Sequence, residues 1–92
     1  MAMAFIMEFE GATLDQYDEV IEAMGLTDGV APEGALFHWV TETPTGIRVT
    51  DVWEDPAAFE SYAAEEIGPK TAAAGIAPPQ VTSHDVHNVI KR

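Results

Sequence analysis

The sequence predicts a single α+β domain, residues 1–92, in which strands and helices follow the order β-α-β-β-α-β. Two segments have apolar residues at helical spacing, and four others have the apolar or alternating runs that are typical of strands. Each helical segment is preceded by a capping signal. This order is that of the ferredoxin-like fold, with a four-stranded antiparallel sheet and both helices on one face.

The first half of the chain has the pattern of a strand followed by a helix. Residues 2–9 alternate between two faces, and after a turn Thr13 and Gln16 have the spacing of a capping box. Apolar residues then recur every three or four positions until Gly25, a residue typical of the end of a helix. We expect an irregular loop over residues 26–34, because Gly, Pro and Asp are frequent there.

The second half repeats the alternation of strands and helix. Residues 35–42 and 47–54 have strand patterns, and the "TPTG" between them suits a short hairpin connection. A helix is expected after Asp55, which is followed by a proline at the first helical position. Gly68, which precedes a proline, is expected to break this helix, and one further turn over "KTAAAG" stays open. The last strand is predicted over residues 80–90.

Composition excludes several classes of partner. Four Lys and Arg residues stand against 16 Asp and Glu residues, and the formal charge of -12 repels nucleic acid and anionic membrane surfaces. The short apolar run at the N-terminus meets an acidic residue too early to span a bilayer. The absence of cysteine fits a reducing compartment, so we expect a cytoplasmic protein. No phosphate-binding or zinc-protease motif is present, and we expect no cofactor.

The faces of the sheet indicate a homodimer. Pairing the central hairpin about its turn predicts one face with Phe37, Trp39, Val49, Asp51 and Trp53, and an opposite face with Leu36, His38, Val40, Thr50 and Val52. Both faces carry large apolar residues, although helices cover only one of them. We expect the bare face to pack against a second copy in a closed two-fold arrangement.

The segment "DVWEDPAAFESYAAEEIGP", after "ALFHWVTETPTGIRVT", resembles the dimeric α+β barrel superfamily, in particular small relatives of the antibiotic-biosynthesis monooxygenases. The ending "SHDVHNVI" is like the final strand of uncharacterised members of the same size. The resemblance implies the fold above and a range of chemistries: cofactor-free oxygenation of polyketide phenols, haem degradation, isomerisation, or no known activity. It also implies that Trp53 lies in a cavity between the sheet and the helices.

Haem degradation fits this sequence poorly. The haem-degrading branch that the chain resembles uses an asparagine in the first strand and a histidine in the second helix. Here the first strand offers Met7, Glu8 and Phe9, and the second helix, "PAAFESYAAEEIG", contains no histidine.

Asp51 and Trp53 are the main candidates on the third strand. A carboxylate desolvated among aromatic side chains is a candidate general base, whereas the alternative places Asp51 at a hydrated position. Trp53 is either a pocket wall or only a core residue. Phe59 and Tyr62 are expected beside it, and Tyr17 and Tyr62 would bind a ligand through their hydroxyls.

The three histidines are not expected to bind a metal within one subunit. His84 and His87 are an odd number of positions apart and face opposite sides of a strand. His38 lies at the other edge of the sheet, roughly 14 Å away at about 4.8 Å per strand. Pairing of His38 with His84 or His87 across a dimer interface stays open, and the alternative is hydrogen-bonded interface histidines.

Two functions remain possible. The first is a homodimeric enzyme that performs cofactor-independent oxygenation or proton transfer, such as isomerisation or cyclisation, on a small apolar or aromatic molecule. Its candidate catalytic residues are Asp51, Trp53, His38 and His87, and its candidate substrate-binding residues are Tyr17, Phe37, Trp39, Phe59 and Tyr62. The second is a non-catalytic dimer that binds a small ligand or has only a structural role.

Overall fold

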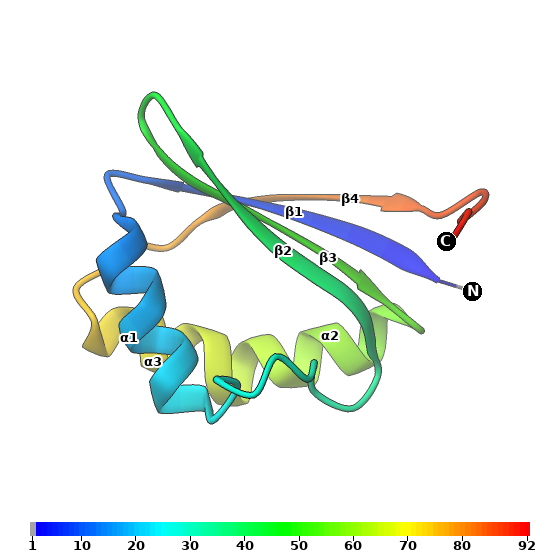
Figure 1. Ribbon diagram of the computed structural model, residues 1–92, viewed down its shortest axis with the longest axis horizontal. Coiled ribbons are helices and arrows are strands. Elements are labelled where there is room, and N and C mark those ends of the chain that lie inside the picture. Colours follow the sequence, from blue (N-terminus) through cyan, green and yellow to red (C-terminus); the bar gives the residue numbers. More distant parts are fainter. Residues whose placement is uncertain (1) are drawn as a thin grey trace.

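A computed structural model describes residues 2–92 and confirms the predicted ferredoxin-like fold. The strands are β1 (Met3–Glu10), β2 (Ala35–Thr43), β3 (Gly46–Trp53) and β4 (Gln80–Asp85). They form one antiparallel sheet in the order β2-β3-β1-β4, and the helices lie on one face of it (Figure 1). None of the helices in the described part of the chain is both long enough and apolar enough to cross a membrane.

Helix α1 (Leu14–Met24) begins and ends where its sequence signals predict. The Gln16 amide N–H donates to Thr13 Oγ1 at 3.1 Å, and the Thr13 amide donates to the Gln16 side chain at 3.0 Å. Gly25 adopts the left-handed conformation, with φ of 73°, that closes the last turn. These contacts fix the position of α1 and therefore of Tyr17 on its inner side.

The second helical segment is continuous where a break is predicted. Helix α2 (Pro56–Tyr62) continues through a π-helical turn, η1 (Ala63–Ile67), into α3 (Gly68–Ala73). The predicted break at Gly68 is therefore wrong. In the wider turn the Gly68 amide bonds to the carbonyl of Ala63, five residues earlier, and the following proline lies in the first turn of α3, where an amide donor is not needed.

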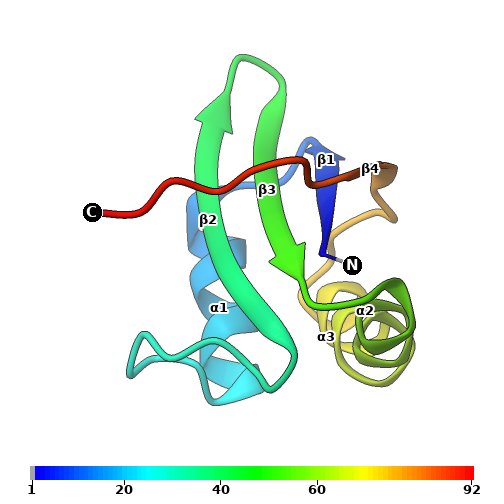
Figure 2. The same cartoon turned by 90° about the vertical axis from the view of Figure 1, so that its right-hand side faces the viewer.

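Strand β4 ends at Asp85, five residues before the predicted end. Asp85 pairs with Met3, the first residue of β1, and beyond this pair the Val86 amide donates one more hydrogen bond, to the Ala2 carbonyl at 3.0 Å. The remaining segment, residues 86–92, crosses the outer face of the sheet toward β2 (Figure 2). On that face the Lys91 ammonium lies 5.3 Å from the centroid of the Phe37 ring.

The inner and outer side chains of β2 are the reverse of the predicted ones. Thr43 pairs with Gly46 across a two-residue turn, so His38 lies opposite Asp51 and Trp39 lies opposite Thr50. A shift of one residue moves side chains to the opposite face of a sheet. The predicted faces are therefore wrong for β2, and His38 rather than Trp39 shares the inner, helix-covered face with Asp51.

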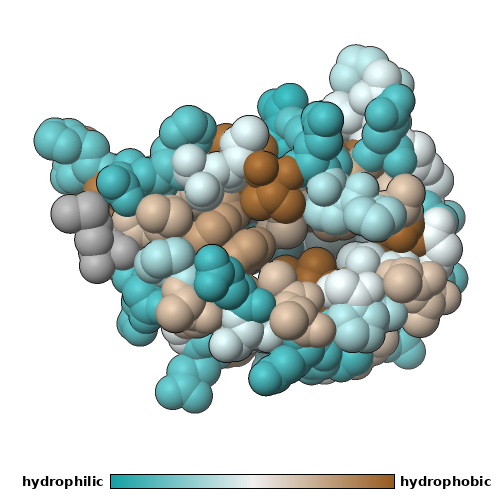
Figure 3. Space-filling view, turned by 180° about the vertical axis from the view of Figure 1, so that it is seen from behind, coloured by the Kyte–Doolittle hydropathy of each residue, from teal (hydrophilic) through white to brown (hydrophobic). Residues whose placement is uncertain are grey.

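The core lies between the inner face of the sheet and the helices. Trp53 is 1% exposed, and the Phe59 ring stacks on the Phe5 ring at a centroid separation of 3.8 Å. Seen from behind, apolar residues gather along the middle of the molecule, between hydrophilic residues above and below (Figure 3). The two layers are thus joined by a continuous apolar zone that also encloses a cavity.

Candidate functional site

A cavity of about 470 Å³ lies between α1, the loop that follows it, the inner face of the sheet and the second helical segment. This volume is in the range of small-molecule sites. Most of its wall is aliphatic or aromatic, and the wall residues include no lysine or arginine. Its polar side chains come from α1, both strands of the β2–β3 hairpin and the second helical segment, and they are Tyr17, His38, Asp51, Trp53, Tyr62 and Thr71.

Asp51 is the buried polar centre of this wall, with an exposed fraction of 4%. One carboxylate oxygen, Oδ1, lies 2.6 Å from His38 Nδ1, and the other, Oδ2, accepts a hydrogen bond from the Trp53 indole N–H at 3.2 Å. An ionised carboxylate only accepts hydrogen bonds, so His38 Nδ1 carries a hydrogen and donates it. Both oxygens of the carboxylate are therefore engaged by donors in fixed positions.

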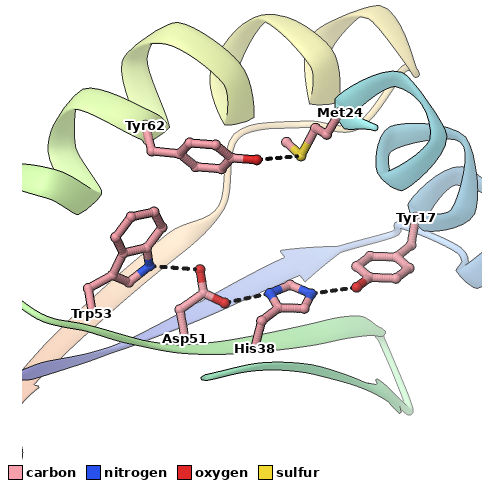
Figure 4. A network of polar contacts seen from close by, with 6 residues as sticks. All are labelled: Tyr17, Met24, His38, Asp51, Trp53 and Tyr62. Carbon is pink, nitrogen blue, oxygen red and sulfur yellow. Dashed lines mark hydrogen bonds and ion pairs between the residues drawn. The ribbon is translucent and has the colours of Figure 1, made fainter. Parts of the chain in front are cut away.

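His38 links Asp51 to Tyr17. Because Nδ1 donates to Asp51, the other nitrogen of a neutral imidazole, Nε2, is an acceptor, and the Tyr17 hydroxyl donates to it at 2.5 Å. The two rings are within 8° of parallel with centroids 5.9 Å apart, a separation too large for face-to-face contact. The rings lie end to end (Figure 4), so the hydroxyl approaches the in-plane lone pair of Nε2.

These contacts form a continuous chain, Tyr17–His38–Asp51–Trp53, which we call the relay (Figure 4). A hydroxyl, an imidazole and a carboxylate joined in this order allow a proton to leave the hydroxyl for the imidazole, with the carboxylate stabilising the resulting charge. The relay therefore has the parts needed for general base chemistry or for activation of the Tyr17 oxygen.

Tyr62 lies across the cavity from Tyr17 and His38, and its ring contacts that of Trp53 (Figure 4). Its hydroxyl donates to the sulfur of Met24 at 3.4 Å. A thioether is a weak acceptor, so a ligand oxygen would be a stronger partner for this hydroxyl. Tyr62 is thus well suited to orient a polar group of a bound molecule.

Both tyrosines resist ionisation. Burial, and then the charges of Asp51 and Asp18, raise the pKa of Tyr17 to about 12. Burial, followed by the charges of Glu66 and Asp51, also raises the pKa of Tyr62. Each phenol therefore remains neutral and able to donate throughout the neutral and mildly alkaline range.

Ultraviolet titration of the tyrosines tests this environment. A raised pKa in the folded state stabilises the fold fully below pH 10, the ordinary pKa, and this stabilisation is lost as pH rises through the folded value of about 12 for Tyr17. We expect little tyrosinate absorbance in the native protein at pH 10, and about half ionisation in urea at that pH. Tyr17→Phe should remove the later part of the native titration. Ordinary titration of both phenols in the folded protein would contradict the buried geometry.

Six of the predicted site residues line the cavity, and they are Tyr17, Phe37, His38, Asp51, Trp53 and Tyr62. Phe59 lies behind the wall, packed on Phe5 and against the edge of Trp53. It is therefore a core residue rather than a wall residue.

Phe37 lies at the rim of the cavity, and Trp39 and His87 lie outside it. Trp39 is 50% exposed and lies on the outer face opposite Thr50, so it is not a pocket wall. Phe37 belongs to the cavity rim, but it pairs with Val52 and its ring contacts Lys91 on the outer side. His87 is exposed in the segment after β4 and is not part of the relay. The ring of His38 faces the cavity, and within the chain its two nitrogens bond to Asp51 and Tyr17.

Sequence reasoning missed the direct contact between His38 and Asp51. The signal that reveals it is the hairpin turn: a two-residue connection, with Thr43 opposite Gly46, places His38 directly opposite Asp51. A four-residue connection, with Glu42 opposite Ile47, has the same register, whereas an odd number of connecting residues would place His38 on the other face. The aliphatic wall contributed by Leu26, Val30 and Pro32 of the loop was also missed, because loops carry no periodic pattern.

The described residues do not form a metal-binding cluster. Among residues 2–92 there is no group of three or more His, Cys, Asp or Glu side chains placed to hold a metal ion. The relay itself offers one imidazole and one carboxylate, already bonded to each other.

No protein-family model and no curated protein matches the sequence. Several solved structures do match. A candidate antibiotic biosynthesis monooxygenase from Chloroflexus aurantiacus has 19% identity and a TM-score of 0.68, with 99% of this chain and 98% of that chain covered. SnoaB, a cofactor-independent oxygenase from Streptomyces nogalater, has 15% identity and a TM-score of 0.66, with 99% and 98% covered.

A dimeric ferredoxin-like protein of unknown function from Jannaschia sp. CCS1 has 19% identity and a TM-score of 0.59. The match covers 94% of this chain and 100% of that one. At these identities the similarity shows a shared fold. The chain is thus similar in fold to proteins of the antibiotic biosynthesis monooxygenase type and to others without known function.

Proposed function

We propose that this protein is a cofactor-independent enzyme that removes a proton from a small, uncharged, apolar or aromatic substrate. The observation that carries the proposal is the imidazole of His38, held between Asp51 and Tyr17 in the wall of an apolar cavity. A base whose tautomer is set by a buried carboxylate is the arrangement that proton abstraction needs.

In the proton step, a proton moves along the relay from Tyr17 to His38. The Tyr17 hydroxyl gives its proton to His38 Nε2 while its oxygen takes a proton from the substrate. The imidazolium that forms is stabilised by Asp51, which the Trp53 indole N–H keeps in place. The substrate is left as an enolate or carbanion, and Tyr62 is placed to donate a hydrogen bond to its oxygen.

Two outcomes are open to such an anion. It takes a proton back at another atom, which is isomerisation or cyclisation, or it reacts with molecular oxygen. The fold shared with a cofactor-independent oxygenase from Streptomyces nogalater supports the second outcome. Both outcomes begin with the same proton abstraction, so that step is the part of the proposal that the relay supports.

The substrate is expected to be uncharged. The wall contains the carboxylate of Asp51 and no lysine or arginine, and the chain as a whole carries a formal charge of -12. An anionic ligand would enter a low-dielectric space without a counter-charge, which is strongly unfavourable.

Hydrogen–deuterium exchange of a simple ketone tests the proton step. Tetralone, a neutral bicyclic ketone with acidic C–H bonds beside its carbonyl, is incubated with the protein in D₂O and analysed by mass spectrometry. We expect exchange well above the buffer rate, and a loss of about a hundred-fold or more in His38→Gln, as for removal of a general base. Oxygen consumption in the same mixture separates oxygenation from simple proton transfer.

Two results would contradict the proposal. Exchange that is equal in the wild type and in His38→Gln would show that His38 is not the base. Binding of tetralone and of related neutral ligands without any exchange or oxygen uptake would favour a non-catalytic small-ligand-binding protein.

The protein is also proposed to be a homodimer that pairs through the outer face of the sheet. This face carries the half-exposed Trp39, and no helix covers it (Figure 2). The similarly folded Jannaschia protein is dimeric. Replacing Trp39 with glutamate is expected to shift sedimentation from dimer to monomer at micromolar concentration, whereas an unchanged dimer would place the interface elsewhere.

A further inference from the structure

The relay joins a hydroxyl, an imidazole and a carboxylate in the same order as the serine hydrolases do. The hydroxyl–imidazole and imidazole–carboxylate contacts are 2.5 Å and 2.6 Å. In such an arrangement the imidazole accepts the proton of the hydroxyl while the oxygen attacks a carbonyl. We propose that Tyr17 is a nucleophile and accepts an acyl group from an activated ester.

The reaction needs only the relay residues, the ester and water. The Tyr17 oxygen forms a bond to the carbonyl carbon, and its proton moves to His38 Nε2. The tetrahedral intermediate then expels the alcohol or phenol of the ester, which takes the proton from Nε2. The product is an acyl ester of Tyr17, and attack by water, with His38 again accepting a proton, restores the free phenol and releases the acid.

The surroundings of Tyr17 favour transfer of the acyl group from the ester to the Tyr17 oxygen. A phenol with a pKa of about 12 is a poorer leaving group than an acidic phenol such as nitrophenol, so an acyl group is more stable on Tyr17. Tyr17 remains protonated at neutral pH, and the proton therefore leaves during attack rather than before it. The apolar cavity beside it can receive the acyl chain.

Tyr62 provides a comparison within the same molecule. It also lines the cavity and its pKa is also raised, but its hydroxyl contacts the Met24 sulfur instead of an imidazole. A thioether cannot take the proton as the oxygen attacks. If the imidazole is what activates the phenol, only Tyr17 should be acylated.

The test uses nitrophenyl acetate on the full-length protein. Release of nitrophenol is followed by absorbance, the reaction is quenched early with acid, and the acetyl group is located by peptide mass spectrometry. We expect one acetyl group on Tyr17 and none on Tyr62. His38→Gln and Asp51→Asn, each checked for folding by circular dichroism, should slow acetylation by about a hundred-fold or more. Glu22→Gln, an exposed position on the same helix, should not.

Any other pattern overturns the proposal. Acetylation of lysines only, similar acetylation of both tyrosines, or a rate unaffected by both relay variants would show that Tyr17 is not an activated nucleophile. The inference shares the relay with the proposed function but needs no acidic C–H bond. Tetralone exchange without acetylation of Tyr17 would therefore reject acyl transfer alone, and acetylation without exchange would reject proton abstraction alone.

Discussion

Asp51→Asn is expected to lower the rate of proton abstraction by about a hundred-fold or more while the fold is retained. Two donors, the Trp53 indole N–H and His38 Nδ1–H, each bond to a separate oxygen of Asp51. Asparagine has only one acceptor oxygen at this site. The indole is a donor only, so it keeps that oxygen, and the amide NH₂ then faces Nδ1. His38 must move its hydrogen to Nε2, where it can no longer act as a base.

The assay is tetralone exchange in D₂O, with circular dichroism as the test of folding. Asp85→Asn is the matched control, because Asp85 is exposed at the end of β4 and the change in charge is the same. We expect the control to keep the wild-type rate. Wild-type activity in Asp51→Asn would show that the carboxylate does not set the tautomer of His38.

Trp53→Ala is expected to be the most destabilising single substitution in the site, with a loss of about 3–5 kcal/mol in the free energy of unfolding. Trp53 is 1% exposed, and its ring contacts the rings of Phe59 and Tyr62. Its removal leaves a large cavity and takes the donor away from Asp51 Oδ2. Since small domains are stable by only about 5–15 kcal/mol, much of the chain would unfold at moderate urea.

Urea denaturation measures this loss directly. Val30→Ala is the comparison, because Val30 also borders the cavity but is 64% exposed, and its truncation should change the free energy of unfolding by no more than about 0.5 kcal/mol. Equal effects of the two substitutions would mean that Trp53 is not the packing centre of the inner face.

Local sequence rules were sufficient for the helix ends. Thr13 with Gln16, Gly25, and Asp55 all act as their sequence context predicts, because a cap depends on contacts within a few residues. The helix end predicted at Gly68 is wrong. Whether a Gly-Pro pair ends a helix depends on the turn before it, and here a π-helical turn lets the helix continue through the proline.

The sequence was sufficient to identify individual residues of the site, but not the contacts between them. Asp51 and Trp53 were identified because an acid among aromatic residues is unusual in a strand. The partner of Asp51 depended on the hairpin register, and the four letters "TPTG" do not by themselves show whether an even or an odd number of residues joins the two strands. The connection has an even number of residues, so His38 rather than Trp39 lies on the face of Asp51. The contact of His38 with Tyr17 links β2 to α1, and no local pattern reports such a contact.

The most direct test of the relay is nitrogen-15 NMR of the His38 ring in the native protein near pH 8. The structure predicts a hydrogen on Nδ1, a downfield ring proton protected from exchange by its bond to Asp51, and an unprotonated Nε2 that accepts from Tyr17. Both features should be lost in Asp51→Asn. A hydrogen on Nε2 in the wild type, or rapid exchange of the ring proton, would contradict the relay and with it both reactions proposed for the cavity.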